Sequence, residues 1–323
     1  MNHILVERKG LARYITLNRP KALNSLTHDM IGEIQTALNT HITDDNVDVI
    51  VLNSNSDRAF CAGGDMKATR QLAIDHQWDK LQAFFKEEYA LNLAISTCPK
   101  PYVSLVDGVA MGGGLGLSVH GTALIVSENA KLAMPETAIG FFPDVGGTYF
   151  LSRAPHDAGL WLALTGQIVK GVEAVAVGLA THCVAAEKWP ELTHALEQTG
   201  RTALDDTLKN LSNNEISSEF SNTLQQRATW FSEPDLSSLI TTLQAAAGTS
   251  EDAATLLKRV KANSPFAMNL TRQCLIDAAK QPDLKACLAL ELIAADTAAR
   301  HPDFIEGVRA VLVDKNKAQW VND

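Results

Sequence analysis

The chain has 323 residues, of which 46% are hydrophobic and 20% charged, a composition typical of a soluble globular protein with one large domain or two smaller ones. The formal net charge of −9 argues against nucleic acid as the main partner, because binding to phosphates requires a basic surface. The sequence contains no unbroken run of about 18 apolar residues, so we expect no membrane-spanning helix.

The N-terminal residues predict a β-strand, not a targeting segment. Residues 1–18 contain no long apolar region and no Arg- and Ser-rich amphipathic leader. The five cysteines are scattered and form no C-x-x-C pair, which is typical of reduced thiols in core positions. We therefore expect a cytoplasmic protein.

Short β-like runs alternate with helical patterns through the first half of the chain. The run ILVERKGLARYITLN predicts a hairpin that turns at Lys9 and Gly10. Residues 26–42 have apolar side chains at helical spacing, and Thr27 is a suitable N-cap. The Val- and Ile-rich runs VDVIVLNS, PYVSLVDG and TALIVSE and a short THCV then predict strands. Strands separated by helices indicate a mostly parallel sheet with covered faces.

The character of the sequence changes after about Glu187. Residues 189–250 are polar with a helical tendency, and the Ala-, Leu- and Lys-rich remainder predicts packed helices. We found no internal repeat and no low-complexity linker. We therefore predict an α/β core over residues 1–187 and a helical region over residues 188–323 that packs on it.

Two glycine-rich segments each lie between a β-like run and a helical one: AFCAGGDMKA (residues 59–68, the first glycine segment) and DGVAMGGGLGLSVHG (residues 107–121, the second). Neither supplies the Lys and hydroxyl pair of a phosphate-binding P-loop. A dinucleotide fingerprint that starts at Gly112 fails at Leu117. The hydrolase G-x-S-x-G pattern fails at His120, which makes Ser118 a helix residue and not a nucleophile.

Another use of the glycine segments fits better than these three. Two turns from neighbouring βα units can each direct one backbone N–H at a single point, which would form an oxyanion hole. Such a pair stabilises the charge that develops on a carbonyl oxygen, and losing one donor typically costs roughly 3–4 kcal/mol. The alternative is that the glycines serve only tight turns and close helix packing.

Two carboxylates lie in the apolar stretch MPETAIGFFPDVGG, which we call the acid segment (residues 134–147). Glu136 and Asp144 have Phe141 and Phe142 among their neighbours, and burying a carboxylate is costly unless it is hydrogen-bonded or neutralised. Such surroundings are typical of a working acid, base or nucleophile. Pro143 excludes one uninterrupted helix that carries both acids. The alternative is structural, with Glu136 as a helix cap and Asp144 as a turn residue.

A third carboxylate falls on the apolar stripe of a predicted helix. Glu88 shares this stripe with residues spaced three or four apart, namely Leu81, Phe84, Phe85 and Ile95. A carboxylate there needs a partner. The alternative is a boundary residue whose charge reaches water.

These segments resemble the crotonase, or enoyl-CoA hydratase/isomerase, superfamily. The matching pieces, in order, are LNRPKALNSL, AFCAGGDMKA, KPYVSLVDGVAMGGGLGL, AMPETAIGFFPDVGG, and LTG followed by GLATHCV. The sequence is also similar, more narrowly, to the 3-hydroxyisobutyryl-CoA hydrolase branch through FFKEEYALN, GLSVHG, SPFAMNLTRQCL and HPDFIEGVRAVLVDK. The similarity spans nearly the whole chain.

The resemblance implies an α/β crotonase core of repeated ββα units, a helical C-terminal part and an acyl-CoA thioester as substrate. By position, Gly64 and Gly113 would donate the oxyanion-hole N–H groups. Glu136 would be the main catalytic carboxylate, as nucleophile or as base, with Asp144 as its partner. Glu88 would accept a hydrogen bond from a substrate hydroxyl.

One departure from the hydratase pattern bears on the reaction. Hydratases carry a second glutamate two residues beyond their glycine triplet, where this chain has Gly116, and commonly have glycine where it has Asp144. This favours hydrolysis of 3-hydroxyisobutyryl-CoA to 3-hydroxyisobutyrate and CoA, a step of valine degradation. The alternatives are an enoyl-CoA hydratase/isomerase and a non-catalytic protein that binds CoA esters.

The resemblance also bears on cofactors and partners. No cofactor is expected, because CoA is part of the substrate. The nine histidines show no H-E-x-x-H motif and no paired Cys/His spacing, so no metal is expected. The superfamily often forms trimers, which allows a homo-oligomer.

Overall fold

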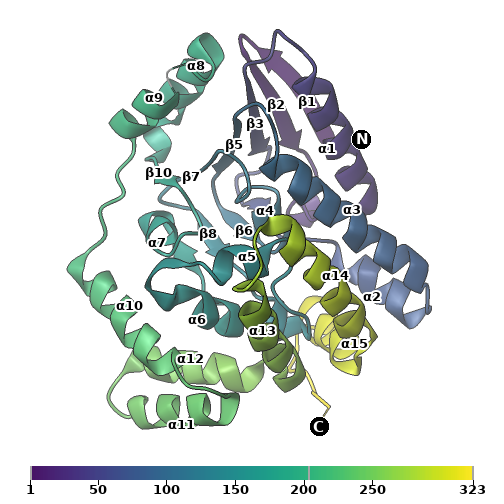
Figure 1. Cartoon of the computed structure of the whole chain (residues 1–323), viewed down its shortest axis with the longest axis vertical. Coiled ribbons are helices and arrows are strands. Elements are labelled where there is room, and N and C mark those ends of the chain that lie inside the picture. The colour runs from purple at the N-terminus through teal and green to yellow at the C-terminus, as the bar shows by residue number, and fades with distance from the viewer. Residues whose placement is uncertain (1, 203, 322–323) are drawn as a thin grey trace. The chain divides into compact units, whose positions relative to one another are not determined.

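The computed structural model describes residues 2–202 and 204–321, and Figure 1 labels the helices and strands of this part of the chain. The chain forms two compact units. Unit 1 comprises Met1–Gly64, Glu87–Leu132 and Val169–Ile216. Unit 2 comprises Asp65–Lys86, Ala133–Ile168 and Ser217–Asp323. From the sequence we predicted a core with the thioester site up to residue 187 and a helical region after it. The two units do not test this assignment, so it stays a prediction.

A six-stranded sheet in unit 1 has the order β1-β2-β3-β5-β7-β10. Its strands are β1 (Ile4–Lys9), β2 (Ala12–Leu17), β3 (Val49–Ser54), β5 (Tyr102–Val106), β7 (Ala123–Val126) and β10 (His182–Cys183). The β1–β2 pair is antiparallel and the other pairs are parallel, which confirms the predicted hairpin and the mostly parallel sheet. Gly10 forms the hairpin turn in the left-handed conformation, with φ +57°.

A second sheet has the order β4-β6-β8-β9. Its strands are β4 (Ala59–Cys61), β6 (Val109–Met111), β8 (Lys131–Ala133) and β9 (Val169–Lys170). Along the chain, β3, β5 and β7 join the first sheet, and the strand that follows each of them joins the second sheet. This alternation is the repeated ββα unit of the crotonase core. These short strands were not predicted, because two or three residues show no periodicity.

Unit 1 also contains α-helices. They are α1 (His28–Ile42), α4 (Gly113–Gly116), α7 (Gly171–Ala176), α8 (Trp189–Thr199) and α9 (Leu204–Leu211). The Thr27 hydroxyl accepts a hydrogen bond from the Met30 N–H at 3.2 Å, which confirms the predicted N-cap. Leucines of α8 and α9 join a buried cluster with side chains of β2, β3, β5 and β7. These two helices therefore cover one face of the larger sheet.

Unit 2 is built mainly from helices. They are α2 (Met66–Ile74), α5 (Gly147–Leu151), α6 (Ala158–Thr165), α10 (Ser218–Phe231), α11 (Leu236–Ala246), α12 (Glu251–Ala262), α13 (Pro265–Ala278), α14 (Leu284–Arg300) and α15 (Pro302–Val308); α3 (Trp78–Ser96) starts in unit 2 and ends in unit 1. Each helix from α10 to α14 begins after a Ser or Asp whose side chain accepts from a backbone N–H of the first turn. The prediction of helices after residue 189 is confirmed.

The centre of unit 2 is α6, which is apolar on nearly all sides and which α5, α10, α12 and α13 contact. Trp161 of this helix is completely buried, and the Arg227 guanidinium lies over its ring at 4.5 Å. Across residues 2–202 and 204–321, no helix has the length and apolar character that crossing a membrane requires.

Candidate active site

The two glycine segments lie at the ends of neighbouring strands in unit 1. Residues 62–64 follow β4, residues 112–114 follow β6, and these two strands pair in parallel. Carboxyl ends of adjacent parallel strands meet at the same edge of a sheet, so the two turns lie together. Gly63 has φ +99°, and a Cβ at this position would lie 3.6 Å from the Gly113 nitrogen. The predicted proximity of the turns is confirmed.

Gly113 is the first residue of α4, and its N–H therefore precedes any acceptor within the helix. A Cβ at Gly113 would lie 3.3 Å from the nitrogen of Gly64 and 2.5 Å from Oε1 of Glu88. The structure thus brings Gly64, Gly113 and Glu88 together around a space that is too small for a side chain. Their roles as oxyanion hole and hydroxyl acceptor stay predictions.

Glu88 lies on the buried side of α3. It is only 3% exposed, and the apolar residues of its stripe, Leu81, Phe84, Phe85 and Ile95, are equally buried. The predicted helix and the position of Glu88 on its apolar stripe are confirmed. The alternative, in which the Glu88 charge reaches water, is wrong.

The acid segment lies in unit 2 and contains two short turns. Glu136 begins a 3-10 helix, Glu136–Ile139, and Gly140 ends this helix with φ +72°. Asp144 follows in irregular chain, so the prediction that no single helix carries both acids is confirmed. Glu136 and Asp144 are 7% and 6% exposed, respectively. Both carboxylates are therefore buried, whereas their apolar neighbours predicted burial of at least one.

Aromatic rings and α15 enclose the acid segment. Phe141 stacks on Phe85 with centroids 5.4 Å apart, and it also contacts Phe142 and Phe304. A Cβ at Gly140 would lie 2.2 Å from the carbonyl oxygen of Asp303. Close approach of α15 thus requires glycine at this position.

A residue that sequence analysis missed, Glu291 of α14, holds the end of the acid segment. Its Oε2 accepts a hydrogen bond from the Gly146 N–H at 2.7 Å. Its Oε1 accepts from the N–H and the hydroxyl of Thr148 at 2.9 and 2.5 Å. Burial raises the pKa of Glu291 to about 8, the charge of Asp144 adds to this rise, and the hydrogen bonds oppose it.

The sequence does contain a signal for Glu291. It shares the buried stripe of α14 with residues spaced three or four apart, namely Leu284, Cys287, Leu288, Ala294 and Ala295. This is the same pattern that identified Glu88, a carboxylate on an apolar helix face that requires hydrogen-bond partners.

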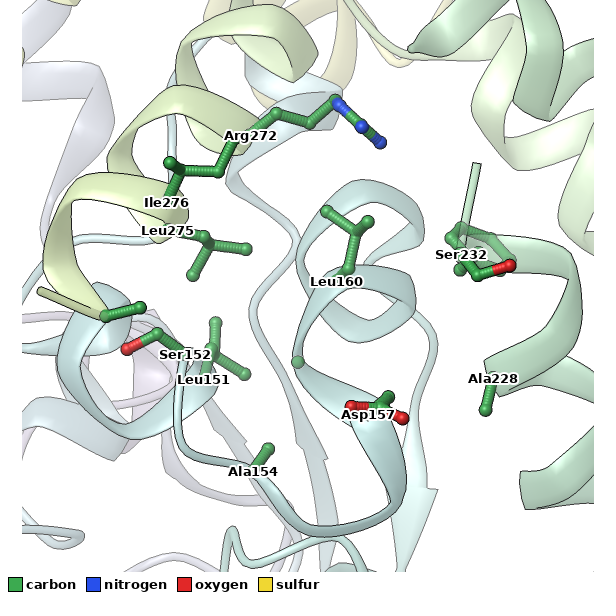
Figure 2. A pocket seen from close by; sticks show the side chains of 13 residues that line it. Leu151, Ser152, Ala154, Asp157, Leu160, Ala228, Ser232, Arg272, Leu275 and Ile276 are labelled. Atoms are coloured by element: carbon green, nitrogen blue, oxygen red, sulfur yellow. The ribbon is translucent and has the colours of Figure 1, made fainter. Parts of the chain in front are cut away.

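Two further features that the sequence raised or the structure shows contribute none of the predicted site residues. Ser118 lies in the turn after α4 and not in a helix, and its buried hydroxyl donates to the Gly114 carbonyl at 2.8 Å. A cavity of about 470 Å³ in unit 2 is lined by Leu160, Leu275 and Arg272, among others (Figure 2). None of the predicted site residues lines this cavity. The part of the chain that the structure describes contains no group of three His, Cys, Asp or Glu residues that could hold a metal ion.

The paired glycine turns on repeated ββα units define the crotonase fold, and comparison with known proteins agrees. The chain belongs to the enoyl-CoA hydratase/isomerase family, whose model matches residues 12–323. It is 40% identical over 326 residues to the mitochondrial 3-hydroxyisobutyryl-CoA hydrolase of Xenopus tropicalis, covering 98% of this chain and 83% of that protein. The human protein of the same name is 38% identical with the same coverage.

Two solved structures resemble the whole chain. A carnitinyl-CoA dehydratase from Mycobacterium thermoresistibile has a TM-score of 0.92 and 35% identity, covering 99% of this chain and 92% of that one. An enoyl-CoA hydratase from Rhodobacter sphaeroides has a TM-score of 0.91 and 35% identity, covering 99% and 93%. The fold is therefore established, whereas the names of these relatives cover both hydrolysis and addition or removal of water.

Proposed function

We propose that this protein hydrolyses a short 3-hydroxyacyl-CoA thioester, 3-hydroxyisobutyryl-CoA, to 3-hydroxyisobutyrate and CoA, as in valine degradation. The observation that carries the proposal is the relocated acid pair. The place of the hydratases' second glutamate is Gly116, the buried last residue of α4, whereas a second acid is present in the acid segment as Asp144. Relatives named as 3-hydroxyisobutyryl-CoA hydrolases, at 38–40% identity over 98% of the chain, support the same reaction.

Substrate binding would use the residues of unit 1 described above. The thioester oxygen would accept hydrogen bonds from the N–H groups of Gly64 and Gly113, which stabilise the charge that develops on this oxygen. Glu88 lies against the Cα of Gly113, since a Cβ there would collide with its Oε1. A hydroxyl on the carbon two bonds from the carbonyl carbon would therefore fall within reach of Glu88.

Hydrolysis requires that the C–S bond breaks, that the acyl carbon gains a water oxygen and that the CoA sulfur leaves as a thiol. Glu136 would act either as the nucleophile or as the general base. It either attacks the acyl carbon to form a mixed anhydride or removes a proton from the attacking water. Asp144 would orient the water and share its proton. Hydroxylamine trapping separates the two routes, because only the first gives a γ-glutamyl hydroxamate at Glu136.

Two assays run side by side test the proposed reaction. One follows free-thiol release from 3-hydroxyisobutyryl-CoA, and the other follows loss of the conjugated absorbance of crotonyl-CoA. Thiol release without loss of absorbance is the expected result. Loss of absorbance without thiol release would overturn the proposal in favour of a hydratase.

The compartment and the oligomeric state stay predictions. Cell fractionation tests the cytoplasmic location, which differs from the compartment printed in the names of the hydrolase relatives. Light scattering on the purified protein tests for a homo-oligomer.

A further inference from the structure

We propose that Glu291 is a positioning residue: it fixes the turn that follows Asp144 and places a second carboxylate within electrostatic range of that acid. The inference deepens the proposed hydrolysis and rests on it, since it concerns how Asp144 is held and charged. Glu291 has no counterpart among the residues that the family resemblance assigned to the site.

The turn between Asp144 and α5 is strained and needs support. Val145 has φ +54° and Gly146 has φ +80°, both in the left-handed region. A β-branched residue in this conformation is a strained outlier, and it persists only when its surroundings hold it. Glu291 binds the next two available donors, the N–H of Gly146 and the N–H of Thr148. These bonds hold the strained turn in place, and Asp144 precedes Val145 directly.

Thr148 allows Glu291 to exist in either charge state. A hydroxyl can donate or accept, so it can donate to the ionised carboxylate and accept from the protonated one across the same 2.5 Å contact. The two backbone N–H groups can only donate, which favours the ionised form. Burial opposes ionisation, and the resulting pKa of about 8 places the change of charge close to neutral pH.

Few other titratable groups face Glu291. Asp144 approaches from the acid segment, Cys274 from α13 and Cys287 from α14 itself. Burial raises the pKa of both thiols, so neither is charged near neutral pH. The charge of Arg153 opposes this rise in the pKa of Cys287. Asp144 is therefore the charge that couples to Glu291, and the repulsion between the two carboxylates is mutual.

This coupling predicts a fall in turnover as the pH rises through about 8. Ionised Glu291 places a second negative charge within electrostatic range of Asp144, the acid proposed to orient the attacking water. Glu291→Gln removes the titration and presents an amide N–H₂ to a backbone donor. We expect its kcat to fall about tenfold or more with KM within about twofold, and its profile to lose the fall near pH 8.

Two further variants keep the test sharp if Glu291→Gln folds poorly. Thr148→Val removes a hydrogen bond that lowers the pKa of Glu291, so the fall should move to higher pH. Asp303→Asn is the matched control. Asp303 is a buried carboxylate of unit 2 that accepts from the Ser264 hydroxyl and the Val321 N–H. Asp303→Asn should lose stability yet keep the wild-type pH profile.

The outcomes separate this proposal from the proposed function. An unchanged fall near pH 8 in Glu291→Gln, or an unmoved fall in Thr148→Val, would overturn the role of Glu291. If the wild type releases no thiol, the hydrolase function fails, and carboxyl ¹³C NMR of the wild type then decides the inference. The resonance missing from Glu291→Gln should titrate near pH 8, and the chemical shift of the Asp144 carboxyl should respond to this change of charge at Glu291. A Glu291 midpoint near its ordinary value, or an Asp144 resonance that does not respond, would overturn it.

Discussion

The glycine turns of unit 1 and the acid segment of unit 2 are held in place by different means. Pairing of β4 with β6 sets the glycine turns, and their groups of interest are backbone N–H groups. The acid segment carries its groups on side chains, and hydrogen bonds to Glu291, on a helix far along the chain, fix its end. The first arrangement should therefore tolerate no added Cβ, whereas the second should depend on charge and hydrogen bonding more than on size.

The largest expected effect concerns the charge of Glu136. Glu136→Gln keeps the shape of the side chain but removes the nucleophile or base, so kcat should fall by about 10⁴-fold. Binding of the CoA ester, measured by calorimetry, should remain largely intact because the change is isosteric. Turnover near that of the wild type would show that Glu136 is neither the nucleophile nor the base.

The glycine turns provide the matching test of size. In Gly113→Ala the new Cβ would meet Oε1 of Glu88 at 2.5 Å and the Gly64 nitrogen at 3.3 Å, which displaces the proposed oxyanion donors. We expect kcat to fall about 10²- to 10³-fold. Gly32→Ala is the control, because a Cβ on this exposed helical glycine meets nothing within 4 Å. It should raise stability by roughly 0.5–1 kcal/mol and leave turnover unchanged.

Asp144 tests whether the acid segment selects the reaction. Asp144→Asn should lower kcat about 10²-fold, since the side chain can no longer accept a proton. Asp144→Gly resembles the glycine common among hydratases, and any gain of crotonyl-CoA hydration in this variant would show that the position helps to choose the reaction. Thiol release that is unaffected in Asp144→Asn would remove Asp144 from the mechanism.

Glu88 should affect one class of substrate only. Glu88→Gln loses the charge that strengthens a hydrogen bond from the substrate hydroxyl, so kcat/KM for 3-hydroxyisobutyryl-CoA should fall about tenfold. Isobutyryl-CoA lacks this hydroxyl, and its slower hydrolysis should change little. An equal loss on both thioesters would mean that Glu88 supports the glycine turn and not the hydroxyl.

The same difference explains which parts of the structure the sequence could predict. The glycine turns are encoded locally, because each cluster follows a β-like run and only glycine fits where Gly113 and Gly114 approach Glu88 and Cys61. Helical periodicity alone also placed Glu88 in the interior. Strands β4, β6, β8 and β9 were missed because their pairing depends on the sheet and not on any pattern within two or three residues.

The support of the acid segment could not be predicted in the same way. Composition showed that Glu136 and Asp144 have apolar neighbours, and Pro143 showed that a turn separates them. Neither feature indicates that Val145 adopts a left-handed conformation or that the partner of this turn is Glu291, because that contact joins segments distant in sequence. The sequence therefore predicted the buried acids but not Glu291, which holds the turn after Asp144.

Stability against pH should distinguish the two units by sign. In unit 1, burial and the nearby Arg13 lower the pKa of His41 to about 4, so the unfolded chain binds the proton more readily. The free energy of unfolding should therefore decrease as the pH falls from about 6.5 towards 4. In unit 2 the raised pKa of Glu291 acts in the opposite direction, and its contribution should be lost as the pH rises from about 4.5 through 8.

Chemical denaturation of the wild type and two variants across this range measures both contributions. Each should change the free energy of unfolding by no more than roughly 1.4 kcal/mol per pH unit within its window. Glu291→Gln should remove only the loss of stability that occurs as the pH rises from about 4.5 to 8. His41→Gln should remove only the loss of stability that occurs as the pH falls from about 6.5 to 4. If Glu291→Gln still lost stability as the pH rises from about 4.5 to 8, Glu291 would already be ionised in the folded protein at neutral pH. The turn after Asp144 would then be held by a fixed charge and not by one that changes near pH 8.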